Sequence, residues 1–264
     1  RIHFFELEDQ SWCPAFLREG VTDFLQFAVI RFHLYKRITV RFRSALRKSG
    51  QKRIIDLCAG GGGPWRTLIP ELLNQQHFPN FNIHLTDYFP NRSAFESLRL
   101  MYPEVVSYSP DPVSARSVPS SEEGFRTLFS SFHHFAPTDA REILRNAIEQ
   151  QQPIAIFEST QRHPLLLLYM LLTPLLVWLA TPFMGPLRIS RLFFTYAIPI
   201  IPLVVMFDGI VSCLRTYTPS ELRQLIASID KAKNYDWETG VETLRGLPIG
   251  ITYLIGLPAR TSTS

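Results

Sequence analysis

Cysteine is scarce in this chain, which has three cysteines among its 264 residues. Cys13, Cys58 and Cys213 lie far apart and follow none of the spacings of zinc modules. They argue against a disulfide framework and a zinc-finger module, and they indicate reduced thiols. Residues 1–10 carry no signal-peptide pattern. We therefore expect an intracellular protein, either cytoplasmic or membrane-associated.

Acidic residues are missing between Asp23 and Asp56, a stretch that holds nine lysines and arginines. Because the net charge is only +4, the rest of the chain is net negative. Apolar residues interleave with the basic ones and predict a basic helix with an apolar side, which would lie on an anionic membrane surface, bind nucleic acid or present a solvated face. The chain lacks an Asn/Asp-Pro-Pro-Tyr/Phe motif and any recognisable nucleic-acid module, so we expect no nucleic-acid partner.

Long polar linkers and internal repeats are also absent, and short apolar runs alternate with helical patterns. This alternation predicts an α/β fold with a mostly parallel sheet. Residues 1–50 have a helical pattern, and Thr218 with Glu221 forms a capping-box signal. The predicted strands are 53–57, 82–86, 105–108, 126–130, 153–157, 234–238 and 249–257, and the later helices are 65–76, 92–101, 138–150 and 218–229.

The most informative segment follows the first predicted strand, where four glycines run from Gly60 to Gly63 before a helix that opens at Pro64. Glycines let a backbone approach a ligand, and a loop at this place in an open α/β sheet binds nucleotides. A Gly-x-Gly-x-x-Gly motif would need glycine at Trp65 or Arg66, and the Gly-Lys-Ser/Thr of a phosphate loop is absent. The loop therefore favours a nucleoside cofactor other than a dinucleotide or nucleoside triphosphate.

The segment D56-L-C-A-G-G-G62 resembles the first motif of class I S-adenosylmethionine-dependent methyltransferases, which is an acid, three residues and Gly-x-Gly. The resemblance implies a Rossmann-like seven-stranded sheet with helices on both faces and S-adenosylmethionine as cofactor. It also implies that Asp56 helps to hold the methionine ammonium, that the loop residues approach the cofactor, and that Asp87 grips the ribose while Tyr88 packs on adenine. The loop residues in question are Cys58, Gly60, Gly61 and Gly62.

Two further strand ends fit the same family. After the third strand the resemblance offers Asp111, or Ser114 with Ala115, as adenine contacts. After the fourth it gives Ser131 to the cofactor, and it brings Phe132, His133 and His134 near the substrate. One of the two histidines is a candidate general base, and packing is the alternative role. The other substrate candidates are Trp12, Trp65 and Glu158. No acidic metal cluster accompanies them, so we expect metal independence.

An apolar insertion interrupts the later half of the chain. Pro164 to Leu187 and Leu192 to Phe207 are uncharged stretches of 24 and 16 residues, each near the length that spans a bilayer. They predict a helical hairpin that acts as a membrane anchor, a homo-oligomer interface or a lid over an apolar substrate. The expected organisation is a helical lid and basic helix over 1–50, the cofactor-binding core over 51–163, the insertion over 164–207, and the rest of the core over 208–264.

These observations together predict a methyltransferase that acts on an oxygen of a small, fairly apolar molecule. A carboxylate acceptor is attractive because the chain is basic and no strong acid–base pair is evident from sequence. The alternatives are a lipid or isoprenoid methyltransferase at a membrane and a membrane-associated protein that binds the cofactor without turnover.

Overall fold

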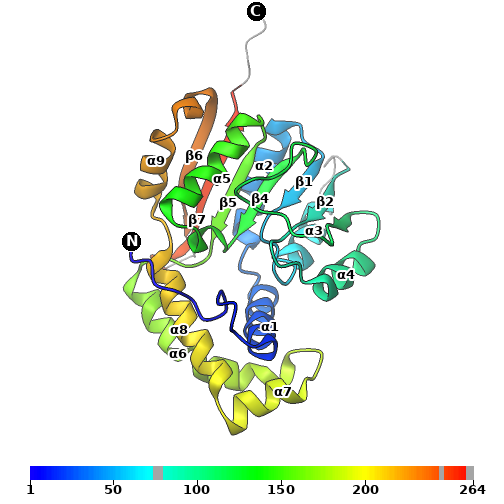
Figure 1. The fold of residues 1–264 in the computed structure, drawn as a ribbon, viewed down its shortest axis with the longest axis vertical. Helices are drawn as coiled ribbons and strands as arrows, with labels where there is room; N and C mark the ends of the chain where they lie inside the picture. The colour runs from blue at the N-terminus through cyan, green and yellow to red at the C-terminus, as the bar shows by residue number, and fades with distance from the viewer. Residues whose placement is uncertain (74–79, 244–246, 260–264) are drawn as a thin grey trace, which may run out of the picture. The chain divides into compact units, whose positions relative to one another are not determined.

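The computed structural model describes residues 1–73, 80–243 and 247–259, which fall into two compact units (Figure 1). The sheet unit comprises Tyr35–Ser159 and Tyr217–Ser264, and the helical unit comprises Arg1–Leu34 and Thr160–Thr216. This grouping differs from the expected segments, because residues 35–50 belong to the sheet unit and residues 1–34 join the apolar insertion. The expected helix end at 74–76 and the final residues 260–264 lie outside the described residues.

The sheet unit is built on a seven-stranded sheet in the order β3-β2-β1-β4-β5-β7-β6. Strands β1 to β5 pair in parallel, whereas β7 runs antiparallel to both β5 and β6. The predicted mostly parallel, Rossmann-like sheet is confirmed. The strands are β1 (Arg53–Asp56), β2 (Asn82–Leu85), β3 (Val106–Tyr108), β4 (Phe125–Phe129), β5 (Ile154–Glu158), β6 (Tyr235–Thr243) and β7 (Gly250–Pro258).

The strand order reverses between β1 and β4, because β2 and β3 extend the sheet on one side of β1 and β4 continues it on the other. At such a reversal the connections that leave neighbouring strands diverge, and open α/β sheets bind ligands in the resulting crevice at the carboxyl ends of the strands. The four strand ends chosen from the sequence follow β1, β2, β3 and β4 and therefore share this edge of the sheet.

Helices cover both faces of the sheet, as predicted. On one face, α5 (Pro137–Glu149) and α9 (Pro219–Ala227) contribute to a buried aliphatic cluster with Leu128 and Ile156. The other face carries an aromatic cluster, in which Phe42 of α2 packs against phenylalanines of β4 and β5. The remaining helices of the unit are the 3-10 helix Lys36–Ile38, α2 (Thr39–Ser49), α3 (Trp65–Leu73), α4 (Arg92–Met101), and the 3-10 helices Phe132–His134 and Asp230–Asn234.

The basic stretch does not form one continuous helix with a free apolar side. α1 ends at Arg31 and α2 begins at Thr39, and the apolar side of α2 is buried against the sheet through Phe42. Several of its charges have partners within the sheet unit, since Arg41 pairs with both Glu238 and Glu242 of β6. Lys36 and Arg53 pair with Glu71 and Glu122, respectively. Within the described residues, α2 is therefore a packed helix of the sheet unit.

The helical unit contains the predicted apolar hairpin. Its two long arms, α6 (Pro164–Ala180) and α8 (Ile200–Arg215), pack against each other, and α1 (Ala15–Arg31) packs against α8. The second arm continues beyond the predicted end of the insertion at 207, up to Arg215. Between the arms lie the 3-10 helix Thr181–Phe183, α7 (Ile189–Leu192) and the π-helix Phe193–Ala197.

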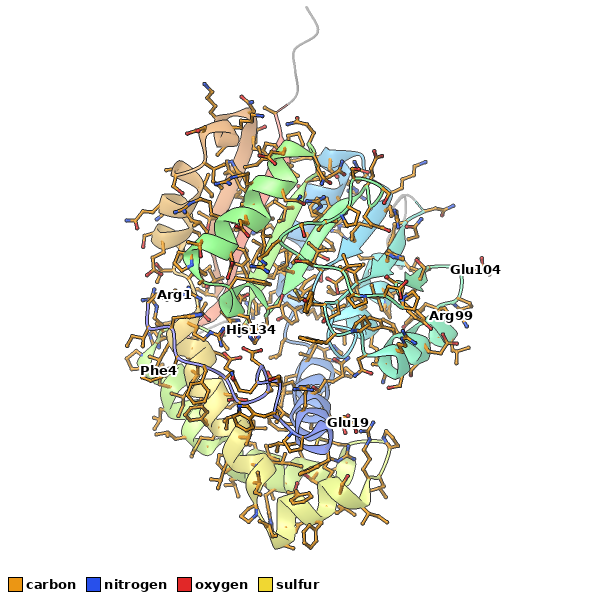
Figure 2. The ribbon with its side chains drawn as sticks, viewed as in Figure 1. Arg1, Phe4, Glu19, Arg99, Glu104 and His134 are labelled. Atoms are coloured by element: carbon orange, nitrogen blue, oxygen red, sulfur yellow. The ribbon has the colours of Figure 1, made fainter. Side chains whose placement is uncertain are left out.

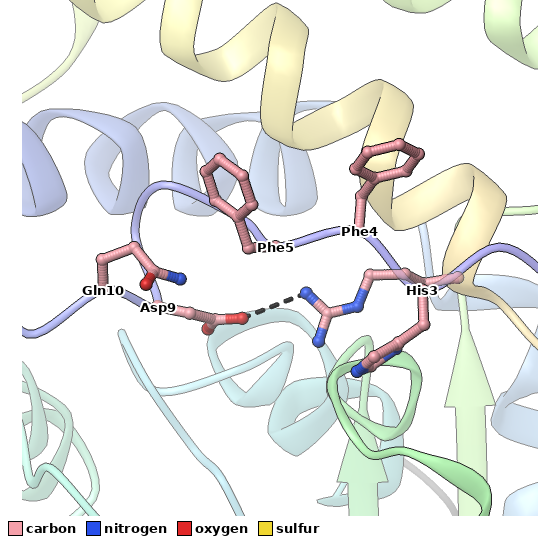
Figure 3. Close-up of a pocket in the computed structure, with 6 residues that line it drawn as sticks. His3, Phe4, Phe5, Asp9 and Gln10 are labelled. Carbon is pink, nitrogen blue, oxygen red and sulfur yellow. Dashed lines mark hydrogen bonds and ion pairs between the residues drawn. The ribbon is translucent and has the colours of Figure 1, made fainter.

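The first 14 residues are not helical, although the sequence pattern predicted helix there. They are held to α8 instead. Arg215 forms ion pairs with Glu6 (3.3 Å) and Asp9 (3.1 Å), the second of which is drawn in Figure 3. Asp208 accepts hydrogen bonds from the backbone N–H groups of residues 7 and 8, at 2.7 and 3.1 Å. These tertiary contacts override the local helical preference of the segment.

Candidate functional site

The carboxyl end of β1 is organised around the buried side chain of Asp56. Its Oδ1 accepts a hydrogen bond from the hydroxyl of Thr127 on β4 (2.6 Å), and its Oδ2 accepts one from the indole N–H of Trp65 on α3 (2.8 Å). The carboxyl group thereby joins two neighbouring strands to the helix that follows the glycine loop. Burial, with a smaller contribution from the charge of Asp87, raises the pKa of Asp56 to about 7.

The glycine loop adopts a backbone that glycine accommodates best. Gly60, Gly62 and Gly63 have φ values of 50°, 96° and 53°, in the left-handed region. A Cβ atom added at Gly60 would meet only open space, so the loop backbone there is accessible to a ligand. Cys58, in the same loop, also has a positive φ of 57°. Gly61, between Gly60 and Gly62, is half-buried.

Asp87, after β2, is fixed by the glycine loop. Its Oδ2 accepts the backbone N–H of Gly60, and its Oδ1 accepts that of Phe89, both at 2.8 Å. Burial raises the pKa of Asp87, while these backbone hydrogen bonds and the attraction of His134 oppose the rise. The next two side chains, Tyr88 and Phe89, are exposed and their rings lie 4.9 Å apart. The carboxylate therefore has a fixed position beside two exposed aromatic rings.

The loop after β3 approaches the residue that carries this carboxylate, because the backbone N–H of Val113 donates to the carbonyl oxygen of Asp87 (2.8 Å). Asp111 is exposed in this loop, and its backbone bonds with the Ser109 hydroxyl. Ser114 is half-buried. Ala115 is buried in the aliphatic cluster. The structure thus brings the predicted third strand end next to the second, while Ala115 faces the core.

The tip of β4 holds a buried histidine–carboxylate pair. His133 Nδ1 lies 2.5 Å from Glu158 Oε2, and Glu158 Oε1 accepts the backbone N–H of Phe132 at 2.7 Å. His134, labelled in Figure 2, follows in the same 3-10 helix, and the two imidazole rings lie 4.3 Å apart. Ser131 Oγ is buried and makes no hydrogen bond to any described residue. Its hydroxyl group can therefore still form a hydrogen bond with a ligand or a water molecule.

A chain of hydroxyl groups lies beneath this tip. Tyr35 and Ser159 each place a hydroxyl 2.6 Å from Ser130 Oγ. Burial raises the pKa of Tyr35, which keeps the phenol protonated. Ser130 has a φ of 45°, a strained conformation for a residue other than glycine. This network directs the backbone from β4 into the segment that carries His133.

Comparison with known proteins decides the fold. No family model and no curated protein sequence matches the chain. The plantazolicin methyltransferase BpumL, solved in complex with SAH, is 13% identical over 96% of this chain and 94% of that chain, with a TM-score of 0.56. The methyltransferase domain of bacterial CtHen1 is 13% identical over 85% of this chain and 99% of its own, with a TM-score of 0.52. The chain has the class I methyltransferase fold.

A third solved methyltransferase is only partly spanned by this chain. Human N-acetylserotonin methyltransferase, solved with SAM, is 13% identical over 92% of this chain, which covers 57% of that protein, with a TM-score of 0.51. At such identities the likeness shows the class I methyltransferase fold alone.

Two predicted substrate residues of this methyltransferase fold are corrected by the structure. Trp65 is fully buried among Phe42, Phe129 and Asp56, so its ring has no surface for a substrate. Phe132 is likewise fully buried in the aliphatic cluster, because its segment turns inward after β4. Trp12 is 64% exposed within the helical unit, and its role in substrate binding stays a prediction.

Several residues of this site were not predicted from the sequence. Thr127 and Ser130 are ordinary strand residues in the sequence, and nothing in their spacing points to Asp56 or Tyr35. The pairing of His133 with Glu158 joins residues 25 positions apart, and it follows only from the parallel register of β4 and β5. Phe89 could have been predicted from the sequence together with Tyr88, because both aromatic residues follow Asp87 directly.

The raised pKa of Asp56 predicts a pH-dependent stability. Burial favours the neutral acid, so this contribution to the free energy of unfolding is complete below the ordinary pKa of 3.8 and is lost as the pH rises to about 7. Relative to Asp56→Asn, which stays neutral, the wild type should lose about 1.4 kcal/mol per pH unit between about pH 5 and 6, and less as the pH approaches 7. Urea unfolding at several pH values measures this difference. Asp236→Asn, at an exposed edge position, is the matched control, and equal slopes in wild type and Asp56→Asn would contradict the assignment.

Proposed function

We propose that this protein is an S-adenosylmethionine-dependent methyltransferase that transfers a methyl group to an oxygen of a small, fairly apolar molecule. The observation that carries the proposal is the Asp87 carboxylate, which the Gly60 N–H fixes beside an open glycine loop. A carboxylate at the end of the second strand of such a sheet is suited to the two hydroxyl groups of a ribose. The exposed rings of Tyr88 and Phe89 are suited to an adenine face.

The residues present fit the rest of this cofactor. The glycine loop offers backbone without side chains at Gly60, where the methionine end would pass. Ser131 supplies a buried hydroxyl without a partner among the described residues. Asp56 holds Trp65 and Thr127, so we assign it to the support of the loop, and any contact with the methionine ammonium would use the remaining lone pairs of its oxygens. The bound cofactor would supply the methyl group as a sulfonium electrophile.

The acceptor is proposed to be a hydroxyl group because the tip of β4 holds a histidine and a carboxylate in contact. A carboxylate acceptor is already anionic, whereas a hydroxyl group must lose its proton during transfer. His133 Nδ1 lies against Glu158 Oε2, and if Nδ1 is the donor in this contact, Nε2 is the ring nitrogen that would take a proton. We propose that His133 Nε2 takes the acceptor's proton and that Glu158 stabilises the imidazolium and fixes its orientation.

A lipid or isoprenoid acceptor is the second candidate, favoured by the exposed apolar surface of the helical unit. The test is transfer of a tritiated methyl group to a panel of phenols, carboxylic acids and lipids. Transfer to phenols supports the first candidate and transfer to lipids the second. Cofactor binding without transfer to any class would overturn the enzymatic proposal in favour of a cofactor-binding protein.

Substitution of Asp87 is predicted to weaken cofactor binding. Loss of hydrogen bonds to a charged group costs about 1.5–3 kcal/mol, so Asp87→Ala should raise the Kd for S-adenosylhomocysteine by about 10- to 100-fold. Asp87→Asn keeps one acceptor oxygen and should fall between Asp87→Ala and wild type. Titration calorimetry measures these constants, and Asp236→Ala, on the edge strand β6, should bind as wild type does. An unchanged Kd for Asp87→Ala would refute the ribose assignment.

Substitution of His133 is predicted to slow the chemical step. His133→Asn retains an N–H donor for Glu158 but removes the base, so kcat with a phenolic acceptor should fall by about 10²- to 10⁴-fold. His33→Asn replaces an exposed histidine of the helical unit and is the matched control, because asparagine tolerates its φ of 47°. A wild-type kcat in His133→Asn with the same phenol would show that His133 is not the base.

Metal removal is predicted to leave the rate unchanged. The proposed transfer uses a sulfonium electrophile and a histidine base, neither of which needs a Lewis acid. Initial rates before and after dialysis against EDTA, with Mg²⁺ or Zn²⁺ added back, test this. A rate that falls on dialysis and returns with a divalent cation would show that metal independence is wrong.

A further inference from the structure

The first arm of the apolar hairpin exposes its side chains along its length. Residues Pro164–Phe183 form 20 consecutive helical residues, and the most apolar 18-residue window among them has a mean hydropathy of 2.0 and is only 17% buried. The core helix of a soluble protein would be mostly buried. The exposed large apolar residues follow helical spacing on α6: Leu165, Leu168, Tyr169, Leu171, Leu172, Leu175, Trp178 and Leu179.

Exposed apolar side chains also occur at the turn of the hairpin and on the second arm. The most exposed of these are at the turn, where Ile189 is 87% exposed and Phe183 is 77% exposed. The others are Leu187, Phe193, Tyr196, Ile198, Ile200, Leu203 and Phe207. We call this surface, from Leu165 to Phe207, the apolar face of the hairpin.

Both arginines at the hairpin turn form ion pairs with acidic residues of α1, and Arg191 is also buried. Arg191 is 1% exposed and forms an ion pair with Asp23 of α1, and it also donates to the carbonyl oxygen of Pro186 at 2.7 Å. Arg188 forms an ion pair with Glu19, the residue labelled in Figure 2. A turn that enters hydrocarbon needs its charges paired, because an unpaired charge there is costly.

We propose that the apolar face binds the surface of a lipid bilayer as a monotopic anchor. The chain leaves the sheet unit after Ser159 and returns to it at Tyr217, so both ends of the hairpin are attached to one folded unit. The helical segment Ile189–Ala197, which precedes the second arm, meets that arm (Ile200–Arg215) at a bend of 82°. A bend of this size between two short helices fits insertion into one leaflet better than two straight spans. This proposal does not depend on the proposed enzymatic function.

A bilayer accounts for the face better than a second copy of the chain does. Protein interfaces carry about one hydrogen bond per 100–200 Å², with charged groups at their rims. Between Leu165 and Phe207 the only charged residues are Arg188 and Arg191, and both are internally paired. The face also includes the turn itself, which a fluid hydrocarbon surrounds without matching its shape. Trp178 and Tyr196 suit the interface region of a bilayer, where aromatic residues with a polar end are enriched.

The test is flotation of the full chain with preformed vesicles, of phosphatidylcholine alone or mixed with phosphatidylglycerol, after purification in detergent and its removal. The wild type should float with both at low and high salt, since the binding is apolar. Leu168→Glu/Leu175→Glu should lower the partition coefficient by at least about tenfold, and so should Ile189→Glu. Val40→Glu/Leu100→Glu alters two exposed apolar residues of the sheet unit and should float as wild type does. Circular dichroism verifies that each variant is folded.

Three results would overturn the proposal. Flotation only with phosphatidylglycerol, abolished by salt, would assign binding to basic residues. Flotation that the hairpin variants leave unchanged would place the contact elsewhere. A wild type that stays unbound would exclude the anchor, and light scattering would then show whether a homodimer, dissociated by Leu168→Glu/Leu175→Glu, covers the face. Because flotation is measured without cofactor, its outcome is separate from that of the methyl-transfer assays.

Discussion

The site in the sheet unit depends on the buried carboxyl group of Asp56. By accepting hydrogen bonds from Thr127 and Trp65, it joins β1, β4 and α3 at the point where the strand order reverses. A buried carboxyl group without partners would be strongly destabilising, so the two donors and the acid depend on one another. With both ends of the glycine loop held in this way, the Gly60 N–H has a fixed direction and can orient Asp87.

A second constraint acts at the tip of β4. Ser130 adopts a left-handed backbone that its hydrogen bonds to Tyr35 and Ser159 hold in place. The chain turns there so that Phe132 enters the core while His133 meets Glu158. Strain of this kind persists only where the surroundings determine the conformation. The packing of Phe132 thus helps to place His133, because the burial of the Phe132 ring fixes the backbone from which the His133 imidazole projects.

Local patterns predicted the order of strands and helices and the glycine loop, because alternation, glycine runs and capping residues act over a few positions. The positions of Asp87 and His133 at strand ends followed from the same reasoning. Contacts between distant residues did not follow: Trp65 looked like a pocket residue beside the loop, yet its indole N–H is the donor that Asp56 needs. The charges of the basic stretch suggested a surface helix, whereas Arg41 has its partners on β6, which lies at the other end of the chain.

The two units place their polar and apolar side chains in opposite ways. In the sheet unit, polar side chains collect at one edge of the sheet and are paired or poised for a ligand, while apolar side chains fill both faces. In the helical unit, charges such as Arg191 are buried and paired, and leucines are exposed. In water, the first arrangement lowers the free energy because it buries apolar side chains, whereas the second raises it because it exposes them. The proposed bilayer partner suits a hairpin that exposes hydrocarbon and pairs its few charges, because a bilayer requires neither hydrogen bonds nor a matched shape.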